Sequence, residues 1–173
     1  RQMCIRDSLG VEWKGIDFSM FWQGVAKRDL WLDGLMFWGI SGGEWQSTGL
    51  KEHLDYYRPE NTTSVFGPNT NAYFPKMYMS KDMNQKVQTR YLQNGAYARL
   101  KNIQLGYTFP TQIINKLHMQ KLRVYVSAEN VLTITSLPSG FDPETTYSSY
   151  SDGNSGKTYP LQTTISFGLH ATF

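Results

Sequence analysis

The residues of this chain that could carry acid–base or metal chemistry are few, and they stand in polar stretches. His53 and Asp55 lie two positions apart, and Asp142 and Glu144 flank a proline. A histidine and a carboxylate can pass a proton when both converge on a substrate, yet such pairs arise freely in polar loops. For Asp142 and Glu144 we expect a turn with a capping carboxylate, the alternative being a calcium or substrate ligand. The sequence therefore predicts no catalytic centre, no metal site and no cofactor.

Aromatic side chains offer a second kind of chemistry, because their flat faces can stack on sugar rings. Six of them stand in the long polar stretches, namely Trp45, Tyr56, Tyr57, Tyr73, Tyr147 and Tyr150. These six side chains are candidates for contact with a glycan or with a partner protein. The alternative is ordinary packing within the loops, which aromatic residues also provide.

The composition limits the class of protein that could position these residues. Aromatic residues make up 14% of the chain and 15 residues are glycine, which favours strands joined by turns. The net charge of +3 comes from scattered basic residues, so nucleic acid is not an expected partner. Cys4 is the single cysteine, which excludes an intrachain disulfide. No apolar run is long enough for a membrane helix, whereas barrel strands hide half their hydrophobicity by alternation.

Apolar and polar residues alternate with a period of two in four stretches, at 11–25, 97–109, 122–135 and 161–173. We expect each stretch to be one strand, with Phe21 the exception on the polar side of the first. A strand of roughly ten residues, apolar outward and polar inward, crosses a bilayer when tilted. A half-buried strand of a soluble sandwich shows the same alternation, so the pattern alone leaves both classes open.

The lengths of the connections favour a membrane barrel over the sandwich. The connection between the strands at 97–109 and 122–135 is short, whereas those at 27–90 and 136–160 are long. In an up-and-down sheet this places the long connections at one end and the short one at the other. Outer-membrane barrels show that asymmetry. Tyr107, Phe109 and Phe173 would then lie at the rim with the short connection.

Four stretches lack the strand pattern. Residues 30–38 could form a further strand or a packed loop, and 44–57 can be helical because Leu50, Leu54 and Tyr57 stand near helical spacing. Residues 58–86 show no sustained period, and an irregular segment of that length is usually functional or stabilised by a partner. Residues 1–8 match the rest poorly, and we predict that they are an artefact of sequencing or cloning.

Several blocks resemble one known family, and they occur in the family's order. They span 13–29, 88–110, 122–135, 140–144 and 159–173. Among them are Trp22-Gln-Gly-Val-Ala-Lys-Arg-Asp29, Leu105-Gly-Tyr-Thr-Phe-Pro110, Leu122-Arg-Val-Tyr-Val-Ser-Ala-Glu-Asn-Val-Leu-Thr133 and Gly140-Phe-Asp-Pro-Glu144. These blocks look like the carboxyl-terminal end of SusC/RagA-type TonB-dependent outer-membrane transporters.

The resemblance implies an all-β fold. Residues 9–173 would be the carboxyl-terminal antiparallel strands of a 22-stranded transmembrane β-barrel, with long external loops containing a short helix, and the plug and earlier strands would be absent. It further implies active import of oligosaccharides or peptides across the outer membrane of a Gram-negative, Bacteroidota-type cell. The implied partners are a SusD-like surface lipoprotein, the TonB energy-coupling complex acting through the absent plug, outer-membrane lipid and the barrel-assembly machinery. The alternative is a soluble β-sandwich carbohydrate-binding module.

The resemblance also implies roles for particular residues. Phe167, Leu169 and Phe173 would form the signal that the barrel-assembly machinery reads. The six loop aromatics would contact the ligand or the lipoprotein. Arg123, Glu129 and His170 would face the lumen, in contact with water, the plug or a neighbouring strand. None of these roles is enzymatic.

Overall fold

The computed structural model describes residues 4–32, 35–39, 49–78, 86–114, 119–146 and 158–173. The chain divides into two compact units. The first, the sheet unit, comprises residues 1–29, 94–137 and 161–173. The second, the loop unit, comprises residues 30–93 and 138–160. Each unit is assembled from stretches that are far apart in the sequence, so the long connections form a folded body of their own.

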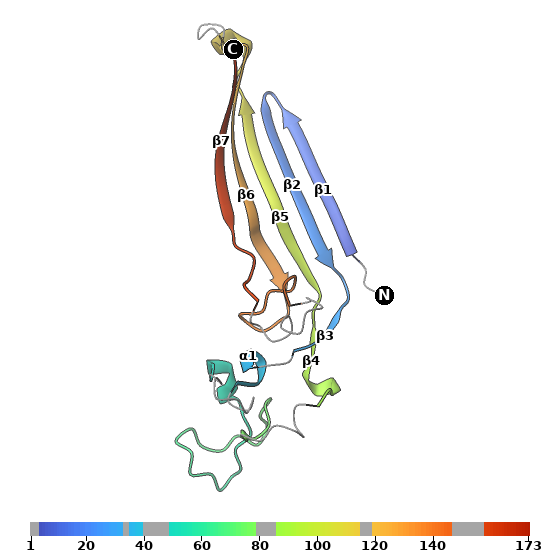
Figure 1. Ribbon diagram of the computed structural model, residues 1–173, viewed down its shortest axis with the longest axis vertical. Helices are drawn as coiled ribbons and strands as arrows, with labels where there is room; N and C mark the ends of the chain where they lie inside the picture. The colour runs from blue at the N-terminus through green and yellow to red at the C-terminus, as the bar shows by residue number, and fades with distance from the viewer. Residues whose placement is uncertain (1–3, 33–34, 40–48, 79–85, 115–118, 147–157) are drawn as a thin grey trace. The chain divides into compact units, whose positions relative to one another are not determined.

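The sheet unit is a five-stranded antiparallel sheet in the order β1-β2-β5-β6-β7 (Figure 1). Its strands are β1 (Cys4–Trp13), β2 (Ile16–Val25), β5 (Tyr97–Thr108), β6 (Lys121–Thr135) and β7 (Thr164–Thr172). Three of the predicted strands are confirmed within a few residues, those at 97–109, 122–135 and 161–173. In each of them period-two alternation runs through most of the strand, which is the pattern a pleated backbone requires.

The predicted single strand at 11–25 is wrong, because the chain reverses direction at Lys14 and Gly15. Both residues have positive φ, 48° and 88°, as a tight hairpin turn between β1 and β2 requires. Trp13 pairs with Ile16 across this turn. The apolar residues are therefore odd-numbered in β1 and even-numbered in β2, yet they lie on the same face of the sheet. Residues 4–8 lie in β1. Their origin outside the natural protein stays a prediction.

Two β-bulges interrupt the regular pairing near the middle of the sheet. Phe21 pairs with Asn102 and Trp22 with Leu100, which leaves Lys101 as an extra residue in β5. Asn102 pairs in turn with Glu129, and Leu100 pairs with Leu132. The two residues of β6 between Glu129 and Leu132 therefore lie opposite the single Lys101 of β5. Asn130, one of those two, has φ 52°. The bulges allow the faces of the sheet to continue unchanged on both sides of the interruption.

The connections of the sheet confirm the expected asymmetry. The Lys14-Gly15 turn, the short helix α2 (Thr111–Ile114) and the carboxyl terminus lie at one end of the sheet, as Figure 1 shows. The long connections, from β2 to β5 and from β6 to β7, leave from the opposite end. Neighbouring strands are therefore joined alternately by short and long segments, as in an up-and-down barrel wall.

The loop unit contains only short elements. They are α1 (Leu35–Trp38), the 3-10 helices η2 (Lys51–Leu54) and η3 (Thr89–Tyr91), and the strands β3 (Asp29–Trp31) and β4 (Leu92–Asn94), which pair at the beginning and end of this stretch of chain. Of the helix expected at 44–57, the described part from residue 49 onward holds a single 3-10 turn. The stretch 30–38, left open between strand and loop, forms the end of β3 and then α1.

The loop unit also has its own small core. Leu32, Phe37, Trp38 and Tyr91 are at most 3% exposed. In the sheet, by contrast, large apolar side chains remain exposed, Phe167 to 85%. The loop unit thus buries apolar side chains internally, whereas the sheet unit presents a whole apolar face outward.

Candidate functional site

The sheet unit has one apolar face, made by side chains that the strand register brings into rows. Three rows run across all five strands from β1 to β7. They are Trp13, Ile16, Tyr107, Val124 and Leu169; then Val11, Phe18, Leu105, Val126 and Phe167; then Leu9, Met20, Ile103, Ala128 and Ile165. Beyond the bulges the same face continues with Trp22, Leu100 and Leu132. Every side chain in the three complete rows is apolar or aromatic, so this face fits a hydrocarbon surrounding.

The opposite, polar face is built on small residues. Its rows include Gly10, Ser19, Gln104, Ser127 and Ser166. Phe21 lies on this face, as expected for the one exception, and it shares a row with Glu129. Arg123 and His170 also lie there, paired with each other across β6 and β7. This polar face matches the lining of a water-filled or plugged barrel.

Two glycines of the polar face make room for large side chains of neighbouring strands. A Cβ at Gly106 would lie 2.5 Å from Asp17 Oδ1 and 2.7 Å from Arg123 Nη2. A Cβ at Gly168 would overlap the phenol ring of Tyr125. The Arg123 guanidinium stacks over that same ring, 4.9 Å from its centroid. The side chains of Asp17, Arg123 and Tyr125 therefore lie flat along the sheet.

The centre of the loop unit is a cluster of aromatic rings that meet mostly edge to face. Tyr91 contacts Trp38, Tyr73 and Phe37, with ring centroids 4.9, 5.4 and 6.4 Å apart. Phe74 lies 5.7 Å from Phe37 and 5.0 Å from Tyr73. Edge-to-face pairs of this kind contribute roughly 0.5–1.5 kcal/mol each beyond the area they bury. The cluster stabilises a stretch of chain that has little regular secondary structure.

Two charged residues hold the segment between residues 54 and 74 in shape. The Asp55 carboxylate accepts hydrogen bonds from Asn69 Nδ2 at 2.8 Å and from the Tyr73 backbone N–H at 3.1 Å. Arg58 donates from Nε to the carbonyl of Gly67 at 2.6 Å and from Nη1 to the carbonyl of Leu54 at 2.8 Å. Each side chain links two parts of this segment, so together they take the place of hydrogen bonds that a regular element would supply.

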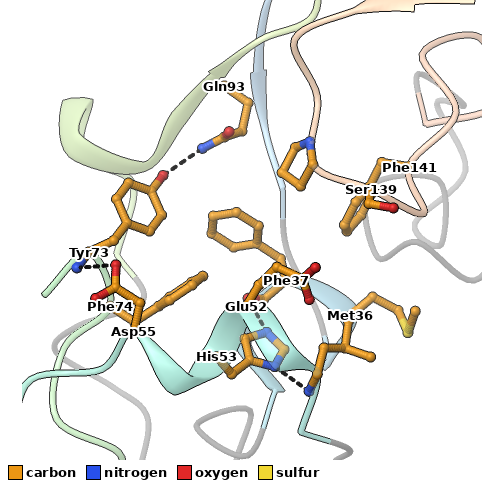
Figure 2. Close-up of a pocket in the computed structure, with 12 residues that line it drawn as sticks. Met36, Phe37, Glu52, His53, Asp55, Tyr73, Phe74, Gln93, Ser139 and Phe141 are labelled. Atoms are coloured by element: carbon orange, nitrogen blue, oxygen red, sulfur yellow. Dashed lines mark hydrogen bonds between the residues drawn. The ribbon is translucent and has the colours of Figure 1, made fainter.

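A pocket of about 530 Å³ opens beside this aromatic cluster, wholly within the loop unit (Figure 2). Its apolar lining comes from Met36, Phe37, Leu50, Tyr73, Phe74, Pro138 and Phe141. Its polar lining comes from Glu52, His53, Asp55, Gln93 and Ser139. The lining residues belong to α1, η2, β4 and two irregular stretches. Pockets of 300–1,000 Å³ with mostly apolar walls and a few polar groups are typical of ligand sites.

Both nitrogens of the His53 ring are occupied by hydrogen bonds to backbone. Nδ1 accepts from the Leu50 N–H at 2.8 Å, which leaves Nε2 to donate to the Phe37 carbonyl at 3.0 Å. The ring is 3% exposed. His53 therefore acts as a structural link between α1 and η2, and its proximity to Asp55 in sequence creates no acid–base pair.

The six predicted loop aromatics have different surroundings. Tyr73 lines the pocket, where its hydroxyl accepts a hydrogen bond from Gln93 Nε2 at 3.0 Å. The Tyr56 ring lies under the Arg58 guanidinium at 4.6 Å, and Tyr57 is 41% exposed outside the pocket. Trp45, Tyr147 and Tyr150 lie outside the described residues. The contact of these aromatics with a ligand stays a prediction.

Sequence patterns did not point to the other residues of the pocket. Phe37, Phe74, Gln93 and Phe141 come from four separate stretches without periodic pattern. The one available signal was the density of aromatic residues between residues 30 and 93, which exceeds what solvated loops need. Such a density of aromatic residues indicates a folded body, but it does not show which residues line a pocket inside it.

The remaining acidic and terminal residues have simple surroundings. Asp142 Oδ1 accepts a hydrogen bond from the Glu144 backbone N–H at 2.8 Å, as expected of a carboxylate that caps a turn. Phe167, Leu169 and Phe173 are 85%, 67% and 77% exposed on the apolar face and at its end.

Within the described stretches, no group of three or more histidine, cysteine or acidic side chains could hold a metal ion. None of the described helices is long and apolar enough to cross a membrane.

Comparisons with known proteins agree with this geometry. No family model matches the chain. TonB-dependent receptors P3 and P26 of Formosa agariphila are 27% and 24% identical over 170 and 169 residues, covering 94% of this chain. A solved structure of the RagAB peptide importer in the closed-closed state superposes on 98% of the chain with a TM-score of 0.65 and 26% identity. A second RagAB peptide transporter structure covers 96%, with a TM-score of 0.64 and 27% identity.

The sheet and its connections define the class of protein. The sheet is antiparallel, it has one apolar and one polar face, and its strands are joined by short connections at one end and long ones at the other. These features are those of the wall of an outer-membrane β-barrel. The chain spans about a sixth of the length of the relatives it matches, 15% and 16% of the two receptors and 17% of each RagAB chain. These similarities support a fragment of a TonB-dependent receptor of the SusC/RagA type.

Proposed function

We propose that this chain forms barrel wall and external mouth of an active importer of oligosaccharides or peptides. The sheet unit would stand in the outer membrane of a Gram-negative, Bacteroidota-type cell, and the loop unit would meet the substrate outside it. Support comes from the RagAB neighbours, described as a peptide importer, and from the receptors of Formosa agariphila. The pocket of the loop unit gives such a substrate a place to bind.

The observation that carries the proposal is the height of the apolar face. From Phe109, just beyond the end of β5, to Ala98 the chain rises through ten regular steps, with Lys101 set aside by the bulge. At roughly 3.3 Å per residue this is about 33 Å along the strand. A strand tilt of about 40° reduces it to about 25 Å across the membrane, the height of the lipid-facing band of outer-membrane barrels. The dimensions of the face therefore suit a bilayer.

The proposal includes partners that act on the whole receptor. A SusD-like surface lipoprotein would cover the mouth, and the TonB complex would supply energy through a plug domain. The barrel-assembly machinery would read Phe167, Leu169 and Phe173, and the exposure of these three side chains on β7 and just beyond it suits such recognition. The protein would act as a transporter with no enzymatic step.

We also propose that residues 1–8 are foreign to this wall. Asp7 pairs with Trp22 and shares the apolar face with it. A carboxylate in the middle of a lipid-facing surface is destabilising. The position of Asp7 therefore supports the proposal that the natural barrel sequence starts near Leu9. The upstream reading frame of the parent gene tests this proposal. A native carboxylate at that position in the parent receptor would contradict it.

The central experiment uses the full-length receptor that carries this segment. A folded barrel needs detergent for solubility, and it migrates differently on a gel before and after heating. Uptake of labelled oligosaccharides or peptides should then depend on TonB and on the lipoprotein. A protein that stays soluble without detergent and shows no heat-dependent migration contradicts the barrel. That result favours a soluble β-sandwich that binds carbohydrate.

A further inference from the structure

We propose that the pocket of the loop unit binds a cationic group of a peptide, either a lysine or arginine side chain or an amino terminus. This inference rests on the proposed function, since it names the kind of substrate that the external mouth selects. The pocket is lined by Glu52, Asp55 and four aromatic rings, and none of the described residues that line it is a lysine or an arginine. Its charge is therefore complementary to a cation.

The size of the pocket fits one side chain with part of the attached backbone. Its volume of about 530 Å³ lies in the lower half of the range of known ligand sites. Phe37 and Phe141 are buried in the wall, while Tyr73 is 36% exposed and stands at the opening. Figure 2 shows the rings of Tyr73, Phe74 and Phe37 on one side and Ser139 and Phe141 on the other. An alkyl stem would contact these apolar walls while its charged end reaches the carboxylates.

The two carboxylates of the pocket have different tasks. Both oxygens of Asp55 accept hydrogen bonds from Asn69 and the Tyr73 backbone, so this residue helps to build the pocket. Glu52 extends from η2 and is exposed. The turn that carries Glu52 is anchored by the His53 hydrogen bonds to Leu50 and Phe37. Glu52 is thus a carboxylate on a fixed support, free to meet a ligand.

The hydrogen-bonding capacity of the pocket also favours a cation over a sugar. The Gln93 amide nitrogen already donates to the Tyr73 hydroxyl and to the Tyr91 carbonyl, at 3.0 and 2.8 Å. His53 donates to Phe37. Apart from the hydroxyls of Tyr73 and Ser139, the side-chain capacity that remains is that of acceptors, chiefly the two carboxylates. Ammonium and guanidinium groups carry donors alone, whereas each sugar hydroxyl is both donor and acceptor. Aromatic faces add attraction for a cation.

Glu52→Gln in the full-length receptor tests the proposal, with Glu60→Gln as the matched control. Glu60 is an exposed carboxylate of the same unit that does not line the pocket. The probes are two labelled peptides of equal length and sequence, except that one has lysine where the other has norleucine. The wild-type receptor should bind the lysine peptide about two to five times more tightly, the range of one exposed ion pair. Glu52→Gln should abolish this preference and Glu60→Gln should keep it.

Two further measurements make the result decisive. Glu52→Lys should reverse the preference, because it places a cation beside the incoming charge. Raising the salt concentration should reduce the preference of the wild type, since exposed charges are screened. A lysine preference that survives in Glu52→Gln, or no preference in the wild type, overturns the inference.

The failure of this inference differs from the failure of the proposed function. A receptor that forms a heat-modifiable barrel and imports substrate, yet ignores the charge at Glu52, refutes the cation site alone. Binding of an oligosaccharide that is weakened by Tyr73→Ala and unaffected by Glu52→Gln refutes it in favour of a sugar. A receptor that forms no barrel refutes the proposed function first.

Discussion

Asp17 in β2 and Arg123 in β6 form an ion pair across the strand that separates them. Nε and Nη2 of Arg123 lie 2.9 and 2.5 Å from the two carboxylate oxygens of Asp17. The intervening residue of β5 is Gly106, which pairs with both Asp17 and Tyr125. The absence of a side chain at Gly106 lets the two charged groups meet over the backbone. The pair ties three strands together on the polar face.

Gly106→Ala should separate this pair. The new methyl group would occupy the space of Asp17 Oδ1 and Arg123 Nη2, which can swing away at little cost to the backbone. The loss is then that of a partly exposed, two-point ion pair, which is small because solvent screens both charges. The temperature at which the full-length barrel loses its heat-resistant migration should fall. Gly10→Ala is the control, because a Cβ there meets nothing within 4 Å. Equal effects of both substitutions would contradict a specific role for Gly106.

Arg58→Lys should loosen the segment between residues 54 and 74. A lysine has one ammonium group and cannot donate to the Leu54 and Gly67 carbonyls while stacking on Tyr56, as the planar guanidinium does. The loss of a hydrogen bond to these part-buried carbonyls costs about 1 kcal/mol. Limited proteolysis of the receptor in membranes should cut this segment faster. Lys51→Gln, an exposed cation of the same unit, should leave the cleavage rate unchanged. Unaltered cleavage in Arg58→Lys would show that Arg58 does not hold the segment.

Tyr91 makes the loop unit sensitive to alkaline pH. Burial raises the pKa of the Tyr91 phenol above its usual value, with the nearby Arg90 opposing part of the shift. Because the folded form holds its proton more tightly, the stabilisation is complete below the unfolded pKa of about 10 and is lost as the pH rises through the folded pKa. Hydrogen exchange in the loop unit should therefore accelerate above about pH 10 beyond the intrinsic base catalysis. Tyr91→Phe should remove the additional acceleration, whereas Tyr78→Phe, at an exposed position, should retain it.

Phe173→Ala should reduce the amount of assembled barrel. The ring of Phe173 is 77% exposed beyond the end of β7, so its removal leaves no cavity and costs little folding energy. A loss of assembly would thus report recognition during insertion. Phe109→Ala provides the comparison, because Phe109 stands at the same rim in contact with Tyr107. Unchanged assembly of Phe173→Ala would refute the proposed signal.

The strands of the sheet were predictable because a single physical requirement acts along their whole length. One face meets an apolar surrounding and the other a polar one, so the alternation at 122–135 identified β6 almost to the residue. The hairpin of β1 and β2 was missed for an instructive reason. A two-residue turn keeps both strands on the same faces while shifting the apolar positions from Trp13 to Ile16. The change from odd-numbered to even-numbered apolar residues, together with the glycine at position 15, is the sequence signal for this hairpin.

The pocket was beyond the reach of pattern reasoning. Its residues are brought together by contacts between separate stretches, such as the Asp55 bonds to Asn69 and Tyr73 and the His53 bond to Phe37. A periodic element repeats its environment, so its sequence shows the repeat. An irregular body has a different environment at each residue. The sequence could therefore indicate loop aromatics such as Tyr73 as a group, but it could not show which of them share a cavity.

The two bulges have a geometric consequence for the complete barrel. Between the rows of Phe21 and Trp22, β2 has no intervening residue, β5 has one and β6 has two. Each bulge slides the pairing beyond it along the strand by one residue, about 3.3 Å. Across three strands the offset reaches about 7 Å, and such offsets, summed around a closed sheet, set the shear that determines strand tilt and diameter. In a closed barrel, Lys101 and Asn130 would thus help to set the width of the lumen.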